Sequence, residues 1–498
     1  MKIEDLKNKK ILIVGKGVEG TAVFDLLKKH LPKNQIVIVD QKDGANYLDK
    51  QKEFDIAIKS PGVKAEVLKI PYTTATNIFL SNAKGKIIGV TGSKGKSTTS
   101  TLIYKMFEKS FGSAQDKQDN VYFGGNIGQS PLEFLDKLND QSWTVFEMSS
   151  FQLKDAKISP HIAVMLMVTA EHLDYHKDEK DYADSKRNIL RFQKESDFAI
   201  INIDYIASHE SDIYTQGKVY WVSRERECER GCYVKDGKII LKISTDQSDG
   251  NERFTHAAKA ARKTSSESQL NTRSLSENRL RNNSYLEENP GSVFSSFAGG
   301  KSSIAKGKVV IDIKNILLPG EHNLENVCAA IMAASLAGVS KENIVKVLKT
   351  FKGLEHRLEF VGEKDGIKFY NDSLATIPKA VIEALKTLKE TETLIAGGYD
   401  RGADFSILGE VIVKSNIKTL VLFLPTGKKI RDAVEKAGKN DIEKFDVTSM
   451  EQAVRIAFAE TSHGKICLLS PASASFGLFK DYKDRGEQFK KEVKNLQK

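Results

Sequence analysis

The stretch Thr91-Gly92-Ser93-Lys94-Gly95-Lys96-Ser97-Thr98 follows directly on an apolar run at residues 87–90. The apolar run predicts a buried strand, and residues 97–107 are compatible with a helix, so the stretch should connect the two. In such a loop the glycines let backbone N–H groups turn toward a phosphate, while a lysine adds a cation and a serine hydroxyl binds Mg²⁺. The segment therefore predicts an ATP site made of Gly92, Ser93, Lys94, Gly95, Lys96, Ser97 and Thr98.

This loop is shorter than the widespread P-loop, which carries a glycine five residues before Gly95. Val90 stands at that position. A surface turn rich in glycine and lysine is the alternative interpretation, but the strand before the loop and the helix after it favour phosphate binding.

Composition limits the class of protein. A chain of 498 residues corresponds to about three domains, and its 40% hydrophobic share is ordinary for a globular protein. The net charge of +10 is modest, and basic and aromatic residues are not interleaved as in a nucleic-acid platform. Four scattered cysteines argue for reduced thiols in the cytoplasm, and no apolar run reaches the ~18 residues of a membrane span.

The N-terminal segment has the order of a Rossmann-like unit. A strand at residues 11–14 runs into Gly15-Lys16-Gly17-Val18-Glu19-Gly20, a helical stretch follows, and Asp40 ends a second strand. The unit is too short for a complete dinucleotide fold, so a nucleotide headgroup is the better guest. Ser60-Pro61-Gly62 closes a further strand at the sheet edge where such ligands bind.

Strands and helices continue to alternate, which predicts an α/β fold of three domains. We expect a Rossmann-like domain at 1–85, a central P-loop ATPase-type domain with a parallel sheet at 86–353, and a second Rossmann-like domain at 354–498. The expected central strands include 145–148, 162–169 and 198–204. Residues 244–303 are polar and poor in strong apolar side chains, which predicts a disordered insert, and 113–120 is similar. Three such domains around one P-loop suggest an enzyme that joins separate substrates by domain closure.

Several polar side chains follow predicted strands and are candidates for the chemistry. Glu147 ends a strand where ATPases supply a carboxylate to the metal, although a helix cap or a solvated charge is the alternative. His172, Asp174 and His176 follow the next strand and could serve a transition metal or Mg²⁺, with a satisfied structural histidine as the alternative for His176. Lys186, on the following helix, is a surface lysine by default.

Later motifs suggest nucleotide and carboxylate contacts. Asn323 and Asn326 lie three apart on one helix face and could grip a purine, or Asn323 could cap the helix. His356-Arg357 present a donor and a fork-shaped cation to phosphates. Asp372-Ser373 and the segment 470–476 end two strands of one sheet and could bind a carboxylate, or form ordinary turns.

Taken in order, these motifs resemble the Mur ligase family of peptidoglycan synthesis. The resemblance rests on GKGVEG (15–20), SPG (60–62), TGSKGKST (91–98), GGNIG (124–128), EMSSFQL (147–153), EHLDYH (171–176), GEHNLEN (320–326), EHR (355–357), NDS (371–373), AGGYDRGADF (396–405) and LLSPASASFGLFKDYKDRGEQF (468–489). The last motif is typical of the branch that adds D-glutamate to UDP-N-acetylmuramoyl-L-alanine. The resemblance implies a cytoplasmic, monomeric, ATP-dependent ligase that forms an acyl phosphate.

The resemblance also implies roles for single residues. The UDP-linked substrate would meet Val18, Glu19, Asp40, Ser60, Pro61, Gly62 and Asn126. Lys96 and Ser97 would hold the ATP phosphates, Ser97 and Glu147 a first Mg²⁺, and His172 a second Mg²⁺ together with a carbamylated Lys186. Asn323, Asn326, His356, Arg357 and Asp372 would meet the nucleotide. Thr376, Arg401, Ser475, Phe476 and Tyr482 would surround the amino acid.

One position departs from the family pattern. A lysine that neutralises the D-glutamate side chain often follows Asp372-Ser373, and Leu374 stands there instead. Arg401 or Lys379 could supply the cation. Alternatives to this branch are another Mur ligase, a folylpolyglutamate synthetase-like ligase, or a nucleotide-binding protein without catalysis. The ending at 468–489 disfavours the first two, and Glu147, His172 and Lys186 together disfavour the third.

Overall fold

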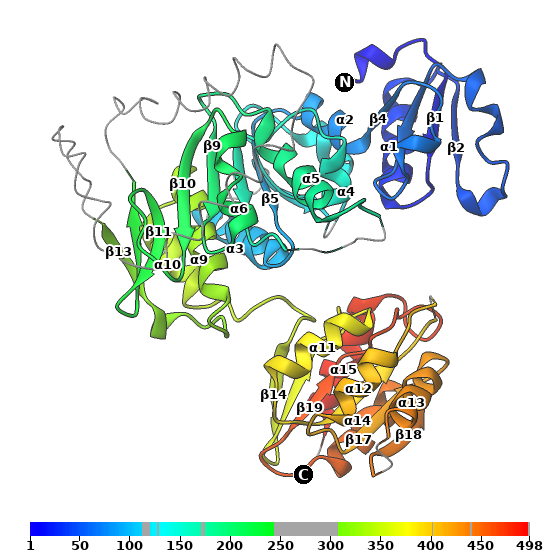
Figure 1. Cartoon of the computed structure of the whole chain (residues 1–498), viewed down its shortest axis with the longest axis vertical. Helices are drawn as coiled ribbons and strands as arrows, with labels where there is room; N and C mark the ends of the chain where they lie inside the picture. Colours follow the sequence, from blue (N-terminus) through cyan, green and yellow to red (C-terminus); the bar gives the residue numbers. More distant parts are fainter. Residues whose placement is uncertain are drawn as a thin grey trace, which may run out of the picture. The chain divides into compact units, whose positions relative to one another are not determined.

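The computed structural model describes residues 1–111, 120–126, 129–169, 171, 175–243, 307–400, 402–438 and 441–496. The chain divides into two compact units, Met1–Phe351 and Lys352–Lys498. The described residues form sheets of four, nine and six strands. Figure 1 labels many of these strands. The predicted α/β class is confirmed. The predicted insert at 244–303 lies outside the described residues, as does nearly all of the segment 113–120.

The four-stranded sheet of unit 1 is entirely parallel, in the order β2-β1-β3-β4. Its elements are β1 (Ile11–Val14), α1 (Val18–His30), β2 (Ile36–Val39), β3 (Ile56–Lys59), β4 (Tyr72–Thr74) and α2 (Ala75–Asn82). The central strand β1 is buried along its whole length, as its unbroken apolar sequence requires. Since β1 and β3 are paired in parallel, the loops at 15–17 and 60–62 leave the same sheet edge.

The nine-stranded sheet has the order β13-β12-β11-β10-β9-β8-β5-β7-β6. The strands are β5 (Lys86–Thr91), β6 (Val121–Gly125), β7 (Trp143–Glu147), β8 (Ile162–Met165), β9 (Phe198–Asn202), β10 (Lys218–Ser223), β11 (Gly231–Lys235), β12 (Lys238–Lys242) and β13 (Lys308–Asp312). The expectation of a parallel sheet is correct from β6 to β11 and wrong at the edge, where β12 pairs antiparallel with β11 and β13. Asp236 and Gly237, both at positive φ, form the two-residue turn between β11 and β12.

Helices cover both faces of this sheet. They are α3 (Lys96–Phe111), α4 (Ser150–Lys154), α5 (Glu179–Arg191), α6 (Ile206–His209), α9 (Asn323–Leu336) and α10 (Lys341–Leu348). One apolar core joins α3, α9 and α10 to Val90, Val164 and Ile200 of the sheet. The other face shares a continuous core with α5 and the four-stranded sheet, which is why both sheets belong to one unit.

The predicted strand at 162–169 is too long, because β8 ends at Met165. The next residues pair with the phosphate loop: Ser93 N–H donates to the Met167 carbonyl (2.7 Å), and Thr169 N–H donates to Ser93 Oγ (3.0 Å). The apolar residues after Met165 therefore brace the loop.

Unit 2 holds a six-stranded sheet in the order β14-β15-β19-β16-β17-β18, parallel except for the hairpin of β14 and β15. Its elements are β14 (Glu359–Lys364), β15 (Ile367–Asn371), α11 (Pro378–Thr387), β16 (Thr391–Gly397), α12 (Ser406–Val413), β17 (Thr419–Phe423), α13 (Thr426–Lys436), β18 (Glu443–Val447), α14 (Met450–Glu460), β19 (Ile466–Leu469) and α15 (Tyr482–Asn495). Strand residues alternate between two cores: Leu394 packs with α11 to α13, and Ile395 packs with α14 and α15.

Candidate active site

The phosphate loop joins β5 to α3 as predicted. Gly95 has φ +85°, and a Cβ at this position would lie 2.1 Å from Asn326 Oδ1, so only glycine fits. The Lys96 ammonium curls over the loop and donates to the carbonyl oxygens of Gly92 (2.8 Å) and Ser93 (2.9 Å). Helix α3 begins at Lys96, so Ser97 lies in its first turn, where backbone N–H groups point at a bound anion.

Lys186 is a buried lysine at the phosphate loop, 1% exposed, rather than a surface residue. It comes from α5, and its Nζ donates to the Gly92 carbonyl oxygen at 2.9 Å. Burial, reinforced by the nearby Lys96 cation, lowers the pKa of the Lys186 ammonium well below its usual value. This shift favours the neutral, nucleophilic amine relative to an exposed lysine.

Glu147 ends β7 and is also buried, with 1% exposure. Asn126 Nδ2 donates to its Oε1 (2.9 Å), and Ser100 Oγ donates to its Oε2 (3.4 Å). The contact with Ser100 brings the carboxylate to α3, the helix that carries Ser97. The capping alternative is wrong, since Ser149 caps α4 through Gln152 N–H.

Of the two histidines predicted in the segment 171–176, the structure describes His176 alone. His176 is buried, with Ser150 Oγ at 3.0 Å from Nε2 and Asp181 Oδ2 at 3.3 Å from Nδ1, and burial lowers its pKa. His176 is therefore a structural histidine that connects α4 to α5. His172 and Asp174 lie outside the described residues, as does Arg401.

A cavity of about 330 Å³ opens in unit 1. Five of the residues predicted for the UDP-linked substrate line it: Val18, Glu19, Pro61, Gly62 and Asn126. The other lining residues are Gly125, Ser130, Ser149, Phe151 and Gln152, which the site prediction missed although three of them lie in the motif EMSSFQL.

The two remaining residues predicted for this site are not among its lining residues. Asp40 accepts a hydrogen bond from Lys16 N–H (2.7 Å), and the Ser60 hydroxyl donates to the Gly15 carbonyl (3.2 Å). Both tie down the loop that leads into α1.

Asn323 and Asn326 share one face of α9, as their spacing predicts. Asn326 Nδ2 donates to Asn323 Oδ1 (3.0 Å), and Asn326 Oδ1 faces Gly95 of the phosphate loop. The capping alternative for Asn323 is wrong, because His322 holds the cap position. Asn326 thus lies at the phosphate loop, and Asn323 is hydrogen-bonded to it.

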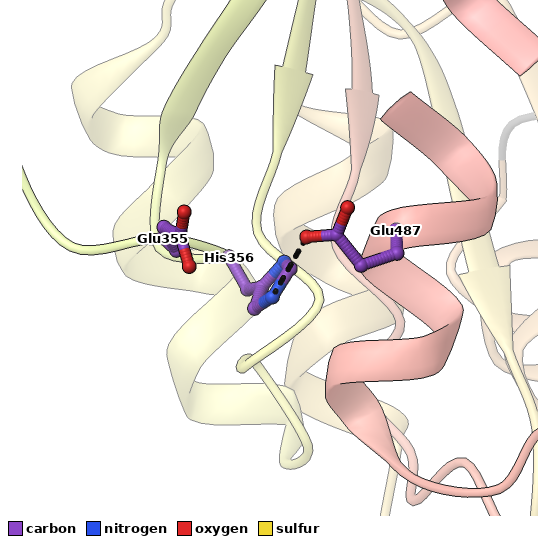
Figure 2. A group of neighbouring side chains, drawn as sticks. All are labelled: Glu355, His356 and Glu487. Atoms are coloured by element: carbon purple, nitrogen blue, oxygen red, sulfur yellow. Dashed lines mark ion pairs between the residues drawn. The ribbon is translucent and has the colours of Figure 1, made fainter. Parts of the chain in front are cut away.

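In unit 2, His356 is buried between Glu355 and Glu487 (Figure 2), and ligand atoms of these three residues lie within 4.8 Å of one another. Its Nδ1 lies 2.9 Å from Asn371 Nδ2, and its Nε2 lies 3.6 Å from Glu487 Oε1. Burial lowers the pKa of His356, so the ring is neutral and accepts from Asn371 at Nδ1. Lys490 already pairs with Glu487 at 2.6 Å. The group is a hydrogen-bonded support for the segment that carries Arg357.

Asp372 follows β15 and is held by two donors, Ser470 Oγ (2.7 Å) and Leu358 N–H (3.2 Å). Burial raises its pKa to about 7. The contact with Leu358 places the carboxyl beside the segment 356–358, so Asp372 and Arg357 are neighbours within this unit, consistent with the effect of Arg357 on the carboxyl.

Residues predicted for the amino acid gather around the ends of β15 and β19. Ser475 is buried, Phe476 is 48% exposed and packs edge-on against Tyr399, and Tyr482 begins α15 with its carbonyl accepting from Ser373 Oγ (2.7 Å). Thr376 follows Leu374, whose carbonyl accepts from Thr376 N–H. Sequence reasoning missed Arg485, which is fully buried and donates to Ser373 and Ser473, bracing both loops.

Comparison with known proteins decides the family. The Mur ligase middle-domain model matches residues 90–230, and the Mur ligase glutamate ligase domain model matches residues 356–473. The UDP-N-acetylmuramoylalanine--D-glutamate ligase of Acetivibrio thermocellus is 32% identical over 99% of this chain and 97% of its own. The protein of the same name from Oenococcus oeni is 34% identical over 98% of both chains. The chain belongs to the Mur ligase family.

A solved structure agrees with this chain in fold. The UDP-N-acetylmuramoylalanyl-D-glutamyl-2,6-diaminopimelate--D-alanyl-D-alanyl ligase of Acinetobacter baumannii aligns with a TM-score of 0.50 at 15% identity, over 90% of this Mur ligase and 87% of its own chain. Among the described helices, none combines the length and the apolar character that crossing a bilayer requires.

Proposed function

We propose that this Mur ligase joins D-glutamate to UDP-N-acetylmuramoyl-L-alanine at the expense of ATP, in peptidoglycan precursor synthesis in the cytoplasm. Two curated relatives that align over nearly the whole chain carry the name of this activity. The observation that carries the proposal is the convergence of Lys96 and Lys186 on the Gly92 carbonyl, next to a loop built for phosphates. A binding protein has no need of a second, buried lysine there.

The environment of Lys186 supports carbamylation. Its neutral amine can add to CO₂, forming an N–C bond and releasing one proton, which turns a would-be cation into an anion. The carbamate would place a negative charge beside the Lys96 cation and provide oxygen atoms for Mg²⁺.

The donors around the loop fit magnesium, since hydroxyl and carboxylate oxygens suit this ion. Ser97 and Glu147 would hold one Mg²⁺, and the carbamate of Lys186 with His172 a second. When bound, the ions would neutralise charge on the phosphates. The side-chain amide of Asn126 and the hydroxyl of Ser100 would keep the Glu147 carboxylate oriented.

The proposed reaction has two steps. The L-alanyl carboxylate attacks the γ-phosphorus of ATP, ADP leaves, and an acyl phosphate forms while Lys96 stabilises the charge in transit. The D-glutamate amine then attacks the acyl carbon, loses a proton and expels inorganic phosphate, which completes the amide. Water must be kept out in between, because it would hydrolyse the acyl phosphate.

The substrates would divide among the predicted domains, 1–85, 86–353 and 354–498. The UDP-linked substrate would occupy the cavity lined by Val18, Glu19, Pro61, Gly62 and Asn126, with Asp40 and Ser60 supporting its rim. ATP would use the phosphate loop with Asn323, Asn326, His356, Arg357 and Asp372. D-Glutamate would meet Thr376, Arg401, Ser475, Phe476 and Tyr482. We further propose that the enzyme acts as a monomer.

The deciding experiment measures phosphate release from ATP in the presence of UDP-N-acetylmuramoyl-L-alanine, screened across D- and L-amino acids. Release that depends on D-glutamate, with an amide product of matching mass, supports the proposal. Release with another amino acid would point to a different Mur step, and release indifferent to the amino acid would remove the ligase assignment.

A further inference from the structure

Glu19, a lining residue of the cavity in unit 1, has one carboxyl oxygen without a hydrogen-bond partner among the described residues. It lies in the first turn of α1 and lines the cavity. One oxygen, Oε1, accepts a hydrogen bond from Gln152 Nε2 at 2.6 Å. The other, Oε2, is buried and has no hydrogen-bond partner among the described residues. A buried polar atom without a partner is costly, so its presence at a cavity points to a partner on the ligand.

The protein does not neutralise a negative charge on this carboxyl. Lys59, on β3, is the charged side chain that acts on Glu19, but its Nζ is already held by Asp155 Oδ2 (2.8 Å) and the Val63 carbonyl (3.0 Å). On α4, the facing group is the neutral amide of Gln152. Burial is the largest influence and raises the pKa of Glu19, which favours the neutral acid.

The expected ligand also favours the neutral form of Glu19. If the proposed function is right, on which this inference rests, the cavity receives a UDP-linked sugar whose diphosphate carries two negative charges. The N-terminus of α1 offers backbone N–H groups to that anion, and an ionised Glu19 in the same turn would repel it. A protonated Glu19 would instead present an O–H donor.

We propose that Glu19 binds the UDP-linked substrate as the neutral carboxylic acid, donating a hydrogen bond from Oε2 to a substrate oxygen. Gln152 fixes Oε1 as the acceptor, which leaves the proton on Oε2, the oxygen without a partner among the described residues. Where free Glu19 is ionised, binding takes up one proton from solvent. The substrate is thereby held more tightly at low pH than at high pH.

Titration calorimetry with UDP-N-acetylmuramoyl-L-alanine and the full chain tests this inference. In the wild type, the dissociation constant should rise at least tenfold between about pH 6 and pH 8.5, with proton uptake visible as a dependence of the heat on the buffer. Glu19→Gln keeps a donor and cannot ionise, so its dissociation constant should match the wild type at pH 6 and change less than about twofold with pH. Glu4→Gln, a neutralised exposed carboxyl in the same unit, should follow the wild type.

Failure of the inference is distinct from failure of the proposed function. Binding with the same pH profile in wild type and Glu19→Gln, or a tenfold loss of affinity in Glu19→Gln at pH 6 with an unchanged melting temperature, would overturn the role of Glu19 alone. Absence of binding at every pH would overturn the UDP-substrate site and this inference with it.

Discussion

Lys96 and Lys186 donate to the same oxygen atom, the carbonyl of Gly92, at 2.8 and 2.9 Å. Lys186 is the more buried of the two, and its burial together with the charge of Lys96 lowers the pKa of the Lys186 ammonium well below its usual value. This pair is the basis on which we propose that Lys186 is carbamylated.

Lys186→Ala should lower the rate of D-glutamate-dependent phosphate release by about 100-fold or more, because the proposed carbamate cannot form. Added acetate should restore part of the rate by offering a carboxylate in the space left behind. In ¹³C NMR with labelled bicarbonate, the wild type should give a carbamate signal that the variant lacks. Lys180→Ala, on the exposed side of α5, is the matched control and should keep both rate and signal. A variant at wild-type rate would refute the role of Lys186.

Glu147→Gln should reduce phosphate release about 100-fold or more while the melting temperature changes little. The amide oxygen can still accept from Asn126, but it carries no charge for Mg²⁺. The Mg²⁺ concentration that gives half-maximal rate should rise. Glu108→Gln, a partly exposed carboxyl on α3, is the comparison and should leave this concentration unchanged. An unchanged Mg²⁺ dependence in Glu147→Gln would exclude Glu147 as a ligand.

The sequence was sufficient for the elements that carry phosphate chemistry, because β1, β5 and the helices after them have strong apolar patterns and glycine signals. It failed where tertiary pairing overrides pattern. The apolar run after Met165 leaves the sheet to bond the phosphate loop, and no local signal marks that exchange. At the sheet edge, the Asp236-Gly237 dipeptide is itself a hairpin signal, and it is typical of the antiparallel pairing of β11 with β12.

The candidate site was predictable only where a continuous sequence motif forms it, as in the phosphate loop. The burial of Lys186 cannot be predicted from the composition of α5 or from the spacing of its residues. The helix is strongly polar, so a lysine on it is expected to be exposed to solvent. Gln152 lines the cavity and bonds Glu19, which lies 133 residues away in the sequence, and Arg485 bonds Ser373, 112 residues away. Hydrophobic periodicity describes only neighbouring residues, so it cannot predict either contact.

Gly95→Ala should raise the KM for ATP strongly. The new Cβ would lie 2.1 Å from Asn326 Oδ1, and the backbone at φ +85° disfavours any side chain. Gly237→Ala separates these two effects, because Gly237 has φ +68° with nothing within 4 Å of the added Cβ. It should cost about 1 kcal/mol of stability and leave the KM for ATP unchanged. Equal effects of both variants on the KM would show that the contact with Asn326 is irrelevant.

Arg401→Ala should raise the KM for D-glutamate about tenfold or more with little change in the KM for ATP, because a carboxylate substrate needs a cation and Leu374 cannot provide one. Lys379→Ala tests the other candidate in the same assay. An unchanged KM in Arg401→Ala combined with a raised KM in Lys379→Ala would assign the cation to Lys379. No change in either would mean that neither residue replaces the missing lysine.

Asp372 should make unit 2 less stable as the pH rises. Its pKa is about 7 in the folded chain and 3.8 as the ordinary value, so between these limits the folded state binds more protons than the unfolded state. The free energy of unfolding therefore falls by on the order of 4 kcal/mol at most between about pH 4 and pH 7, and it is level above that range.

Asp372→Asn removes this ionisation. Hydrogen exchange of β15 and β19 should therefore be slower in the variant than in the wild type at pH 8, after correction for intrinsic rates, and the difference should be smaller at pH 5. Asp441→Asn, an exposed carboxyl in the same unit, should show no such pH-dependent difference. A gain in protection of equal size at both pH values would trace the effect to packing instead of to the buried charge.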